Sequence, residues 1–364
     1  MKVAIMGAGM SGLSCAITLE KHGIEPVIFE KRNTVGDRFV NAEGFFNILN
    51  RPINNCLEYL QDKYEIHLKP ISPINEIKFH SKNEVSSITS NLGSINIRGR
   101  HENSFEKQLA SQVKSKIVFN STLEYEQLKK DFSHVVLATG DGAYASKLNN
   151  YRCDLTCTLK GATVEGSFLA DVVNVWFNYQ FVPKGYAYMI PFSEKEAHIV
   201  MAYPDYEENI KRDIDEMWEK FYEQLRKDLK QELKITDRFE VTRYMIGISN
   251  KPKIENTYFV GNCFGAISPA LGFGQFVAVL TGIYAAQDIC GFGNYEQLVK
   301  PLYENYNNSL IIRRALEKLD DNKLDMAIKS FDNKLFDKAI DYAYGDKTNF
   351  DFLKWLSYFI EPWI

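Results

Sequence analysis

The chain lacks a strong excess of either charge. Its 364 residues include 43 lysines and arginines and 47 aspartates and glutamates, which gives a formal net charge of −4, and no long run carries one sign. Proteins that bind nucleic acid present basic patches to the phosphate backbone. The balanced composition therefore argues against general nucleic-acid binding, and we expect no nucleic-acid partner.

A long apolar run is also missing. A buried strand is predicted to begin at residue 2, which leaves no room for a secretory signal peptide before it. The most apolar late stretch, residues 270–286, contains Gln275 and three glycines and is followed by Gln287 and Asp288. Because a membrane helix needs about 20 consecutive apolar residues, this stretch is too short and too interrupted to span a bilayer. We expect a cytoplasmic protein.

Cysteine and histidine are sparse, with six residues of each. The cysteines are scattered along the chain, unlike those of a small domain held by disulfides. Cys153 and Cys157 would lie about 13 Å apart on a strand, too far for a disulfide, although a helix or turn there would bring them together. No two histidines are three or four residues apart and no His/Cys/Asp cluster has zinc spacing, so we predict no metal site.

The clearest signal that is present lies in residues 1–32. A short apolar run over residues 2–6 predicts a buried strand, and the motif G-x-G-x-x-G follows it at residues 7–12. A helical pattern comes next and ends near Gly23, a residue type typical of helix C-termini. Residues 26–29 then predict a second buried strand, which ends in an acidic residue.

Each part of this unit suits a dinucleotide. Gly7 permits the tight turn, Gly9 lets a pyrophosphate approach the backbone, and Gly12 lets the helix lie close to the strand. The helix N-terminus offers free N–H groups to the phosphates. Glu30 is placed to accept hydrogen bonds from the adenosine ribose, and its charge would repel a 2′-phosphate. The unit therefore predicts binding of FAD or NAD rather than NADP.

A second glycine-rich unit, far along the chain, favours FAD over NAD. Residues 257–262 predict a strand that ends in Gly261 and Asn262, residues 269–274 a glycine turn, and residues 275–289 a helix. The N-terminus of this helix would face the flavin edge that becomes negative on reduction, and Asn262 would hold the ribityl or pyrophosphate part.

Two further segments complete the predicted FAD site. Residues 134–140 predict a buried strand that passes the cofactor, and the polar loop 36–44 offers one arginine as a phosphate or flavin contact, unless that arginine is a solvated loop cation. The predicted FAD contacts are Gly7, Gly9, Gly12, Glu30, Lys31, Arg38, Thr139, Gly140, Gly261, Asn262, Gly272, Phe273 and Gly274.

A substrate-binding sheet is predicted from several strand-like segments. These are residues 75–98, with a turn at 91–93, and residues 153–158, 172–179 and 198–203, followed by one amphipathic helix over 206–233 whose apolar stripe includes Ile210. Residues 186–191 alternate aromatic and small side chains and end in proline. On a strand, Tyr186, Tyr188 and Ile190 share one face, which lines an apolar pocket or forms half of the core of the sheet.

The fold class predicted is α/β (α+β), a Rossmann-like FAD-binding domain with an antiparallel-sheet substrate domain and a C-terminal helical tail. The FAD-binding domain is assigned to residues 1–75, 99–148 and 252–293, the substrate domain to 76–98 and 149–251, and the tail to 294–364. The aromatic end, residues 350–364, docks on the core as a helix, caps an apolar cavity, or makes peripheral contact with a membrane surface.

With these residues, the chain resembles flavoproteins of the p-hydroxybenzoate hydroxylase fold, and within them the geranylgeranyl reductase family. The resemblance covers roughly residues 1–290. Besides the first glycine motif with its acidic residue, residues 36–44 are similar to the family's loop G-x-P-x-x-C-A-E-G, residues 186–191 to its substrate motif Y-x-W-x-F-P, and residues 261–274 to G-D…P-x-x-G-x-G.

The chain departs from these motifs at five positions, which fall in the loop, the substrate motif and the last glycine segment. They are Arg38 for proline, Asn41 for cysteine, Tyr188 for tryptophan, Ile190 for phenylalanine and Asn262 for aspartate. An asparagine can still form hydrogen bonds, so the predicted FAD site is retained.

The resemblance implies reduction of C=C bonds in an isoprenoid by hydride transfer from N5 of reduced FAD. It implies an apolar or lipid substrate near Asn41, Tyr186, Tyr188, Ile190 and Pro191, with Glu43 and Tyr188 as catalytic candidates for proton delivery. Only one such dinucleotide motif is present, so electrons would come from an external donor, NAD(P)H or a reduced carrier. The alternatives are a monooxygenase or halogenase of the same fold, whose motif W-x-W-x-I-P is as near to residues 186–191, and a non-catalytic flavin- and lipid-binding protein.

Overall fold

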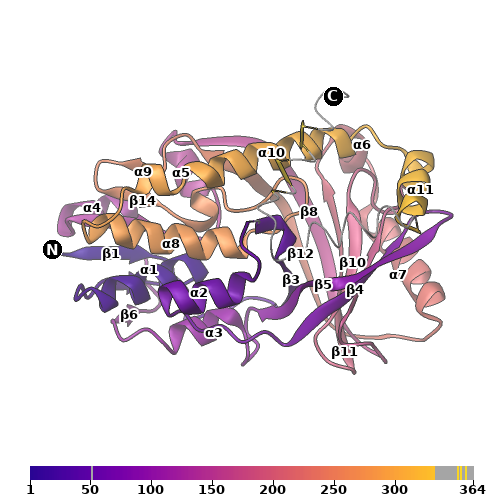
Figure 1. Cartoon of the computed structure of the whole chain (residues 1–364), viewed down its shortest axis with the longest axis horizontal. Coiled ribbons are helices and arrows are strands. Elements are labelled where there is room, and N and C mark those ends of the chain that lie inside the picture. Colours follow the sequence, from indigo (N-terminus) through magenta and orange to yellow (C-terminus); the bar gives the residue numbers. More distant parts are fainter. Residues whose placement is uncertain (51, 333–350, 352, 355–356, 359–364) are drawn as a thin grey trace.

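The computed structural model describes residues 1–50, 52–332, 351, 353, 354, 357 and 358. These residues form two sheets that lie side by side, with helices around them (Figure 1). The predicted fold class, a Rossmann-like part joined to a largely antiparallel sheet with helices towards the C-terminus, is confirmed. No helix in the described part of the chain is long and apolar enough to cross a membrane.

The first sheet is the Rossmann-like one and has six strands. Its order is β13 (Lys253–Ile254), β14 (Thr257–Phe259), β7 (His134–Leu137), β1 (Val3–Met6), β2 (Val27–Phe29) and β6 (Ile117–Val118). All neighbours are parallel except β13 and β14. The central strands β14, β7 and β1 are short, apolar and almost fully buried, which is typical of a parallel sheet that is covered on both faces.

Two helices cross closely beside this sheet, α1 (Met10–Lys21) and α8 (Gln275–Ile289). The approach is close because Gly282 has no side chain, since a β-carbon there would lie 2.1 Å from the carbonyl oxygen of Ser11. Both helices begin at the edge where the parallel strands end, which is the usual ligand-binding edge of such sheets. The crossing therefore places two helix N-termini near one another.

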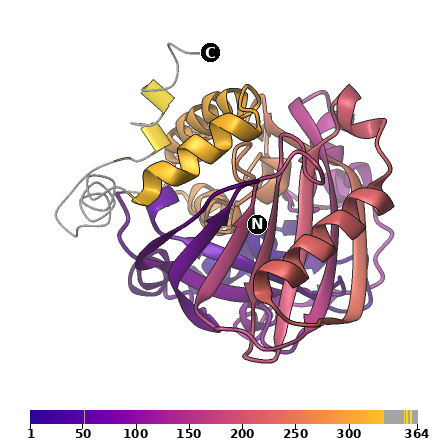
Figure 2. The same ribbon diagram turned by 90° about the vertical axis from the view of Figure 1, so that its right-hand side faces the viewer.

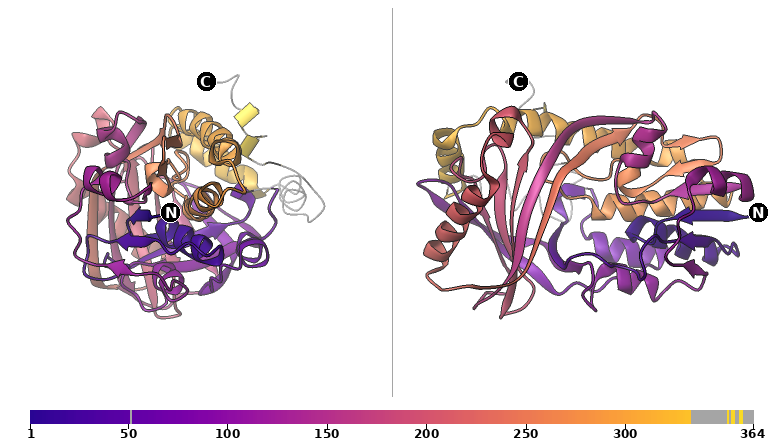
Figure 3. Two further views of the ribbon diagram at one scale, coloured as in Figure 1. Left: turned by 90° about the vertical axis from the view of Figure 1, so that its left-hand side faces the viewer. Right: turned by 180° about the vertical axis from the view of Figure 1, so that it is seen from behind.

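The second sheet has eight strands and is strongly curved. Its order is β12 (Lys234–Ser249), β8 (Tyr151–Glu165), β11 (Glu196–Pro204), β10 (Tyr186–Pro191), β9 (Val172–Trp176), β4 (Ser72–His80), β5 (Val85–Arg98) and β3 (Asn41–Phe46). Only β4 and β9 pair in parallel. The last strand, β3, also approaches β10 and β11, so the sheet curls over its own face. The long strands β8 and β12 reach towards the six-stranded sheet (Figure 3).

The helix α7 (Ile214–Leu229) covers the outer face of this sheet (Figure 2). Its buried residues Met217, Trp218, Phe221 and Leu225 pack against Met189 and neighbouring strand residues. Because alternate residues of a strand point to opposite faces, Tyr186, Tyr188 and Ile190 of β10 lie on the other, inner face. This inner face is the one that looks towards the Rossmann-like part.

The remaining helices are short or lie near the C-terminus. They are α2 (Cys56–Tyr64), α3 (Phe105–Ala110), α4 (Tyr125–Asp131), α5 (Ala143–Lys147), α6 (Glu207–Ile210), α9 (Tyr295–Leu298), α10 (Lys300–Leu316) and α11 (Asp321–Lys329), with single turns of 3-10 helix at 48–50, 261–263 and 330–332. The long helix α10 spans from one sheet to the other along the top of Figure 1.

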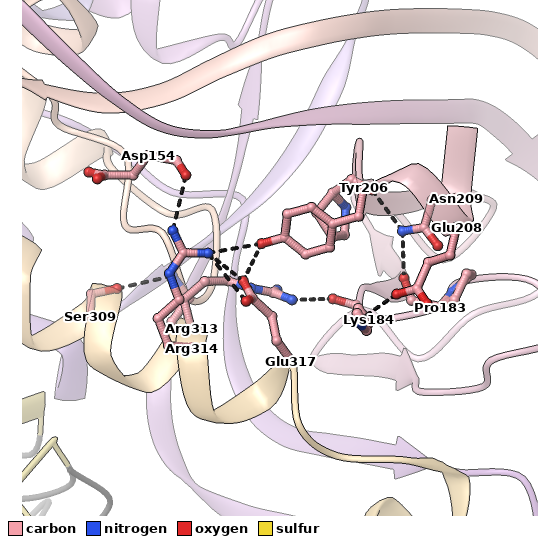
Figure 4. Close-up of polar contacts among 12 residues, drawn as sticks. Asp154, Pro183, Lys184, Tyr206, Glu208, Asn209, Ser309, Arg313, Arg314 and Glu317 are labelled. Atoms are coloured by element: carbon pink, nitrogen blue, oxygen red, sulfur yellow. Dashed lines mark hydrogen bonds and ion pairs between the residues drawn. The ribbon is translucent and has the colours of Figure 1, made fainter. Parts of the chain in front are cut away.

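A cluster of polar contacts fastens the end of α10 to the eight-stranded sheet (Figure 4). Arg313 is only 4% exposed and donates to the carbonyl oxygen of Lys184 and to Glu317, 3.1 Å away. Arg314 donates to the carbonyl oxygen of Asp154 at 3.1 Å and also contacts Glu317. Tyr206 donates its hydroxyl to the same Glu317. The helix is therefore tied to β8 and to the segments on either side of β10 and β11.

Two local predictions are wrong, and one strand was missed. The turn between β4 and β5 lies at residues 81–84 rather than 91–93, because Gly93 (φ +150°) sits inside β5 beside an irregularity in its pairing with β4. Residues 206–233 form two helices, α6 and α7, and Ile210 of the predicted apolar stripe is 64% exposed. The strand β12 was not predicted at all.

Two further observations bear on the predicted division of the chain. β3 lies within residues 1–75, which were assigned to the FAD-binding domain, and it pairs in the eight-stranded sheet. Most of the aromatic end, residues 350–364, lies outside the described residues. Leu353, one of the described ones, is buried against Ala270 and Ile312.

Candidate functional site

The glycine motif forms an open cradle at the end of β1. Gly7 adopts a φ of +116°, and a β-carbon there would lie 2.2 Å from the carbonyl oxygen of Ala138. Gly9 is the N-cap of α1, and a β-carbon built on it would meet no atom within 4 Å. The space beside Gly9 is therefore open next to the first turn of α1, whose N–H groups have no partner within the helix, and this is the arrangement that receives a phosphate.

Glu30 is fixed beside this cradle. Its Oε2 accepts a hydrogen bond from the backbone N–H of Ala8 at 2.8 Å, and its Oε1 accepts one from the N–H of Arg32 at 2.9 Å. The neighbouring Lys31 is exposed and lies on the same loop. The carboxylate is thus held next to the glycine loop, where a ribose that follows the pyrophosphate would come within its reach.

A second group of predicted residues meets at the ends of β7 and β14. The side-chain amide of Asn262 donates to the carbonyl oxygen of Gly140 at 2.9 Å and to the hydroxyl of Tyr244 at 2.6 Å. The hydroxyl of Tyr244 donates to the same carbonyl at 3.0 Å. Thr139 Oγ1 lies 3.0 Å from Cys263 Sγ. Burial raises the pKa of Cys263 to about 11, so the thiol stays protonated at neutral pH.

Tyr244 belongs to this group although sequence reasoning missed it. Burial raises its pKa above the ordinary value, while the positive charge of Arg38 acts in the opposite direction. Arg38 is exposed, and its guanidinium lies 5.4 Å from the ring centroid of Phe39. The alternation around Phe239 and Val241 is a signal that could have revealed the strand that carries Tyr244.

A polar cluster lies at the N-terminus of α8. Glu43 of β3 accepts hydrogen bonds from Asn41 Nδ2 at 2.5 Å and from Gln275 Nε2, and it lies 3.4 Å from Arg98 Nη1. Arg98 Nε also donates to Glu106 at 2.7 Å. Burial alone would lower the pKa of Arg98, but Glu106 and Glu43 raise it above its ordinary value. The cluster thus contains one permanent positive charge between two carboxylates.

Three buried side-chain oxygens in this cluster have no hydrogen-bond partner within the described residues. They are Asn41 Oδ1, Asn96 Oδ1 and Gln275 Oε1. A buried acceptor left unpaired costs about 1–3 kcal/mol, so the cluster suits a ligand that brings N–H or O–H donors. A flavin ring, which carries an N–H group between two carbonyls, has such a donor. Together with the open cradle at Gly9, these atoms make the residues present fit FAD.

The aromatic face of β10 meets the second glycine loop. The hydroxyl of Tyr186 donates to the carbonyl oxygen of Leu271, and a β-carbon on Gly272 would lie 3.2 Å from that hydroxyl. The rings of Tyr186 and Tyr188 are 6.0 Å apart. Burial raises the pKa of both phenols above the ordinary value, so both keep their protons at neutral pH.

The rest of this strand is apolar. Ile190 is buried with Ala42, Ile95 and Phe192 in one hydrophobic cluster, against which Tyr188 packs. Pro191 ends the strand in a buried position. Tyr186 therefore faces the glycine loop, whereas Ile190 belongs to the core of the curved sheet.

A small cavity of about 60 Å³ adjoins the same loop. It lies between β3, residues 265–277 and α10, and its lining includes Phe46, Phe273, Gln275, Leu302 and Leu353. Phe46 and Phe273 meet edge to face with ring centroids 4.8 Å apart. Leu353 thus contributes to covering an apolar cavity, one of the three roles considered for the aromatic end.

The predicted site residues fall into two groups that the fold brings to one edge. The first group surrounds the start of α1 and consists of Gly7, Gly9, Gly12, Glu30 and Lys31. The second group contains the other predicted residues, which lie around the ends of β7 and β14, the start of α8 and the inner face of β10. The sequence did not single out five further residues of these groups, Asn96, Arg98, Glu106, Tyr244 and Gln275. Among them only Gln275, directly after the glycine turn, lies next to a predicted motif. Among the described residues, no three histidine, cysteine or acidic side chains are grouped so that they could hold a metal ion.

The matches between this sequence and known proteins cover short parts of the chain. The family described as NAD(P)-binding Rossmann-like domain matches residues 5–44. Thiamine thiazole synthase from Thermotoga maritima is 38% identical over 68 residues, which is 18% of this chain. The match spans 27% of the length of that relative.

Comparisons of the structure match nearly the whole chain. A geranylgeranyl bacteriochlorophyll reductase-like protein from Thermoplasma acidophilum superposes with a TM-score of 0.73 at 15% identity, covering 94% of each chain. A flavin-dependent brominase superposes with a TM-score of 0.67 at 12% identity, covering 100% of this chain and 99% of the other. The chain therefore has the flavoprotein fold with a Rossmann-like domain of the FAD-binding type, and the predicted resemblance is confirmed at the level of the fold.

Proposed function

We propose that the protein is an FAD-dependent oxidoreductase that reduces C=C bonds of an isoprenoid or a similar apolar substrate. The observation that carries the proposal is the meeting of Tyr186 on β10 with the glycine loop at Leu271 and Gly272. It joins an aromatic, apolar sheet face to the loop that leads into α8. A substrate chain on that face would lie beside a flavin held at the helix N-terminus.

The residues that would hold FAD are those whose geometry fits its parts. The N–H groups at the start of α1 would bind the pyrophosphate, Glu30 the ribose, Asn262 the ribityl or pyrophosphate part, and the start of α8 the flavin edge. When bound and reduced, FAD would supply a hydride to one alkene carbon. The protein must then align the alkene, exclude water and deliver a proton to the other carbon.

Tyr188 suits the delivery of the proton better than Glu43 does. Glu43 accepts hydrogen bonds from Asn41 and Gln275 and pairs with Arg98, which are contacts of a carboxylate that accepts rather than donates. Tyr188 lies on the substrate-facing side of β10, and within the described part of the chain its hydroxyl donates to no protein group. Burial raises its pKa, so the phenol is protonated at neutral pH, and after each transfer it would regain its proton from solvent.

The surroundings support exclusion of water from the reaction. Ile190, Phe192 and Ala42 are buried beside Tyr188, so an alkene bound there would be enclosed by apolar side chains. The charged groups of Glu43 and Arg98 would lie at the edge of this apolar enclosure. We propose that electrons enter from an external donor, NAD(P)H or a reduced carrier protein, because the sequence contains a single such dinucleotide motif.

A monooxygenase or halogenase of the same fold is the second candidate function. Two observations favour it: the strand motif ends in Ile190-Pro191, and the match to the flavin-dependent brominase covers the whole chain. In a third reading, the protein binds flavin and lipid without catalysis.

Product analysis under argon distinguishes these functions. The purified protein is reduced with dithionite, freed of excess reductant and mixed with geranylgeraniol, and the lipid is analysed by mass spectrometry. A gain of two hydrogens supports the reductase, and Tyr188→Phe should slow that gain. An oxygenated or halogenated product that forms only in air would replace the proposal with the second candidate.

A further inference from the structure

A stack of three rings lies on the inner face of the eight-stranded sheet. Phe39, from the loop before β3, is stacked on Phe239 of β12 with centroids 4.0 Å apart and planes 6° apart. Phe239 in turn is stacked on His198 of β11 at 5.1 Å and 18°. The guanidinium of Arg38 lies over the outer ring. The histidine is therefore the innermost member of the stack.

His198 lies on the face that carries the predicted substrate-binding residues. It pairs directly with Ile190 across β10 and β11, and residues that are directly opposite in an antiparallel pair point to the same side. Val200, the next residue on this face of β11, is opposite Tyr188. His198 thus belongs to the same surface as Tyr186, Tyr188 and Ile190.

The ring of His198 is buried without a polar partner. Its exposure is 0%, and neither Nδ1 nor Nε2 has a hydrogen-bond partner within the described residues. Burial lowers its pKa to about 3, and no charged group opposes this effect. The ring is therefore neutral at pH 7, with one donor and one acceptor nitrogen. Leaving both unpaired costs free energy, and a simple core position would be filled better by an apolar side chain.

The cover over His198 is built from an edge strand with irregular pairing and from a loop. Phe239 lies between two irregularities in the pairing of β12 with β8, at Ile235/Asp237 and Val241/Tyr244, and β12 is an edge strand. Its ring occupies the space left by Gly161, where a β-carbon would lie 2.1 Å from Cε1. Phe39 is on a loop, which is held by fewer contacts than a strand. A ligand that displaces Phe239 would gain both the hollow at Gly161 and the nitrogens of His198.

We infer that His198 is a substrate-recognition residue whose ring forms a hydrogen bond with an oxygen function of the substrate, a hydroxyl, carbonyl or ether, after Phe239 moves aside. The substrate is then an apolar chain that carries one oxygen function, rather than a pure hydrocarbon. This inference rests on the proposed function, since it assigns the substrate class of the same sheet face.

The test compares two ligands that differ only in the oxygen. Binding of geranylgeraniol and of the matching hydrocarbon without the hydroxyl is measured by equilibrium dialysis on the FAD-loaded full chain. We expect the wild-type protein to bind the alcohol about fivefold more tightly than the hydrocarbon, which corresponds to the net contribution of one neutral hydrogen bond. His198→Phe should bind both ligands equally, and His198→Gln should restore part of the preference. A preference that survives in His198→Phe would overturn the inference.

A second variant keeps the test decisive if His198→Phe does not fold. Phe239→Ala should expose His198 to diethyl pyrocarbonate, with the modified residue identified by peptide mass spectrometry, whereas wild-type His198 should resist. Geranylgeraniol should protect His198 in this variant better than the hydrocarbon does, and equal protection would overturn the inference.

The two proposals fail in different ways. A protein that reduces the alkene but binds alcohol and hydrocarbon equally would contradict the role of His198 alone. A protein that binds neither ligand would contradict the proposed function and, with it, this inference.

Discussion

Substitution of Glu30 tests the cofactor site most sharply among single changes. Its carboxylate accepts hydrogen bonds from the N–H groups of Ala8 and Arg32, and with FAD bound it would also accept from the ribose hydroxyls. Hydrogen bonds to a charged group contribute about 1.5–3 kcal/mol each. The loss of two such bonds to the ribose corresponds to a decrease in FAD affinity of about 10²–10⁴-fold.

The effect of Glu30→Ala on folding should be much smaller. The two backbone N–H groups that lose their acceptor lie on two different loops. Arg32 is exposed, so water can replace the carboxylate there, and only the N–H of the buried Ala8 is left without an acceptor. We therefore expect purified Glu30→Ala to keep a wild-type circular dichroism spectrum while losing its flavin absorbance. Glu25→Ala, which removes an exposed carboxylate five positions away, is the matched control and should keep its FAD.

The assay is titration of the flavin-free protein with FAD, followed by flavin fluorescence. Wild-type affinity in Glu30→Ala would refute the placement of the ribose at this carboxylate. Affinity that falls equally in Glu25→Ala would show that the loss is one of general charge and not of a specific contact.

Three further outcomes follow from the contacts around the site. Arg98→Met leaves Glu106, which is 5% exposed, without its cationic partner, so the free energy of unfolding in urea should fall by about 3–5 kcal/mol. The control Lys129→Met removes an exposed pair with Glu255 and should not change the free energy of unfolding measurably. Equal effects of the two substitutions would refute the argument. Burial would raise the pKa of Asp288, but Lys253, Tyr258 and the Tyr295 N–H hold it below the ordinary value. The ionised Asp288 therefore stabilises the fold fully above the ordinary aspartate pKa, and this stabilisation is lost as the pH falls through the lowered pKa. Wild type should be more stable than Asp288→Asn at pH 7, and this difference in stability should disappear in acid. A difference that does not depend on pH would contradict the argument. Tyr188→Phe should lower the rate of alkene reduction by about 10²–10⁴-fold with unchanged FAD affinity, and an unchanged rate would move proton delivery to another group.

The parts of the fold that could be predicted are those encoded over short stretches. The strand, glycine motif, helix and second strand of residues 1–32 form one local unit, and the predicted helix 275–289 has the same bounds as α8. In both cases apolar periodicity and glycine position act within a few residues of each other.

The parts that were missed depend on contacts across the chain. β12 is an edge strand that carries several charged residues, so its alternation is partly obscured, as is usual where an edge is protected by charge. Glu43 was singled out as a proton donor from its place in a loop motif. Its carboxylate is held by Arg98 and by Gln275, which is more than 200 residues away. These contacts arise because β3 curls over the sheet, so the spacing of residues in the sequence could not predict them.

The ring stack at His198 shows the same limit. Nothing in the sequence near residue 198 indicates that Phe239 and Phe39 would cover it. Its burial without a partner emerges only when β8, β11 and β12 are laid side by side, because the absent side chain of Gly161 makes room for the ring of Phe239.

The most direct test of the proposed function is re-oxidation of the reduced flavin under argon. The FAD-loaded protein is reduced, excess dithionite is removed, and the flavin spectrum is followed after addition of geranylgeraniol. Prompt return of the oxidised spectrum without oxygen, together with a gain of two hydrogens in the lipid, is the result that the proposal predicts. A flavin that stays reduced until air is admitted would contradict it.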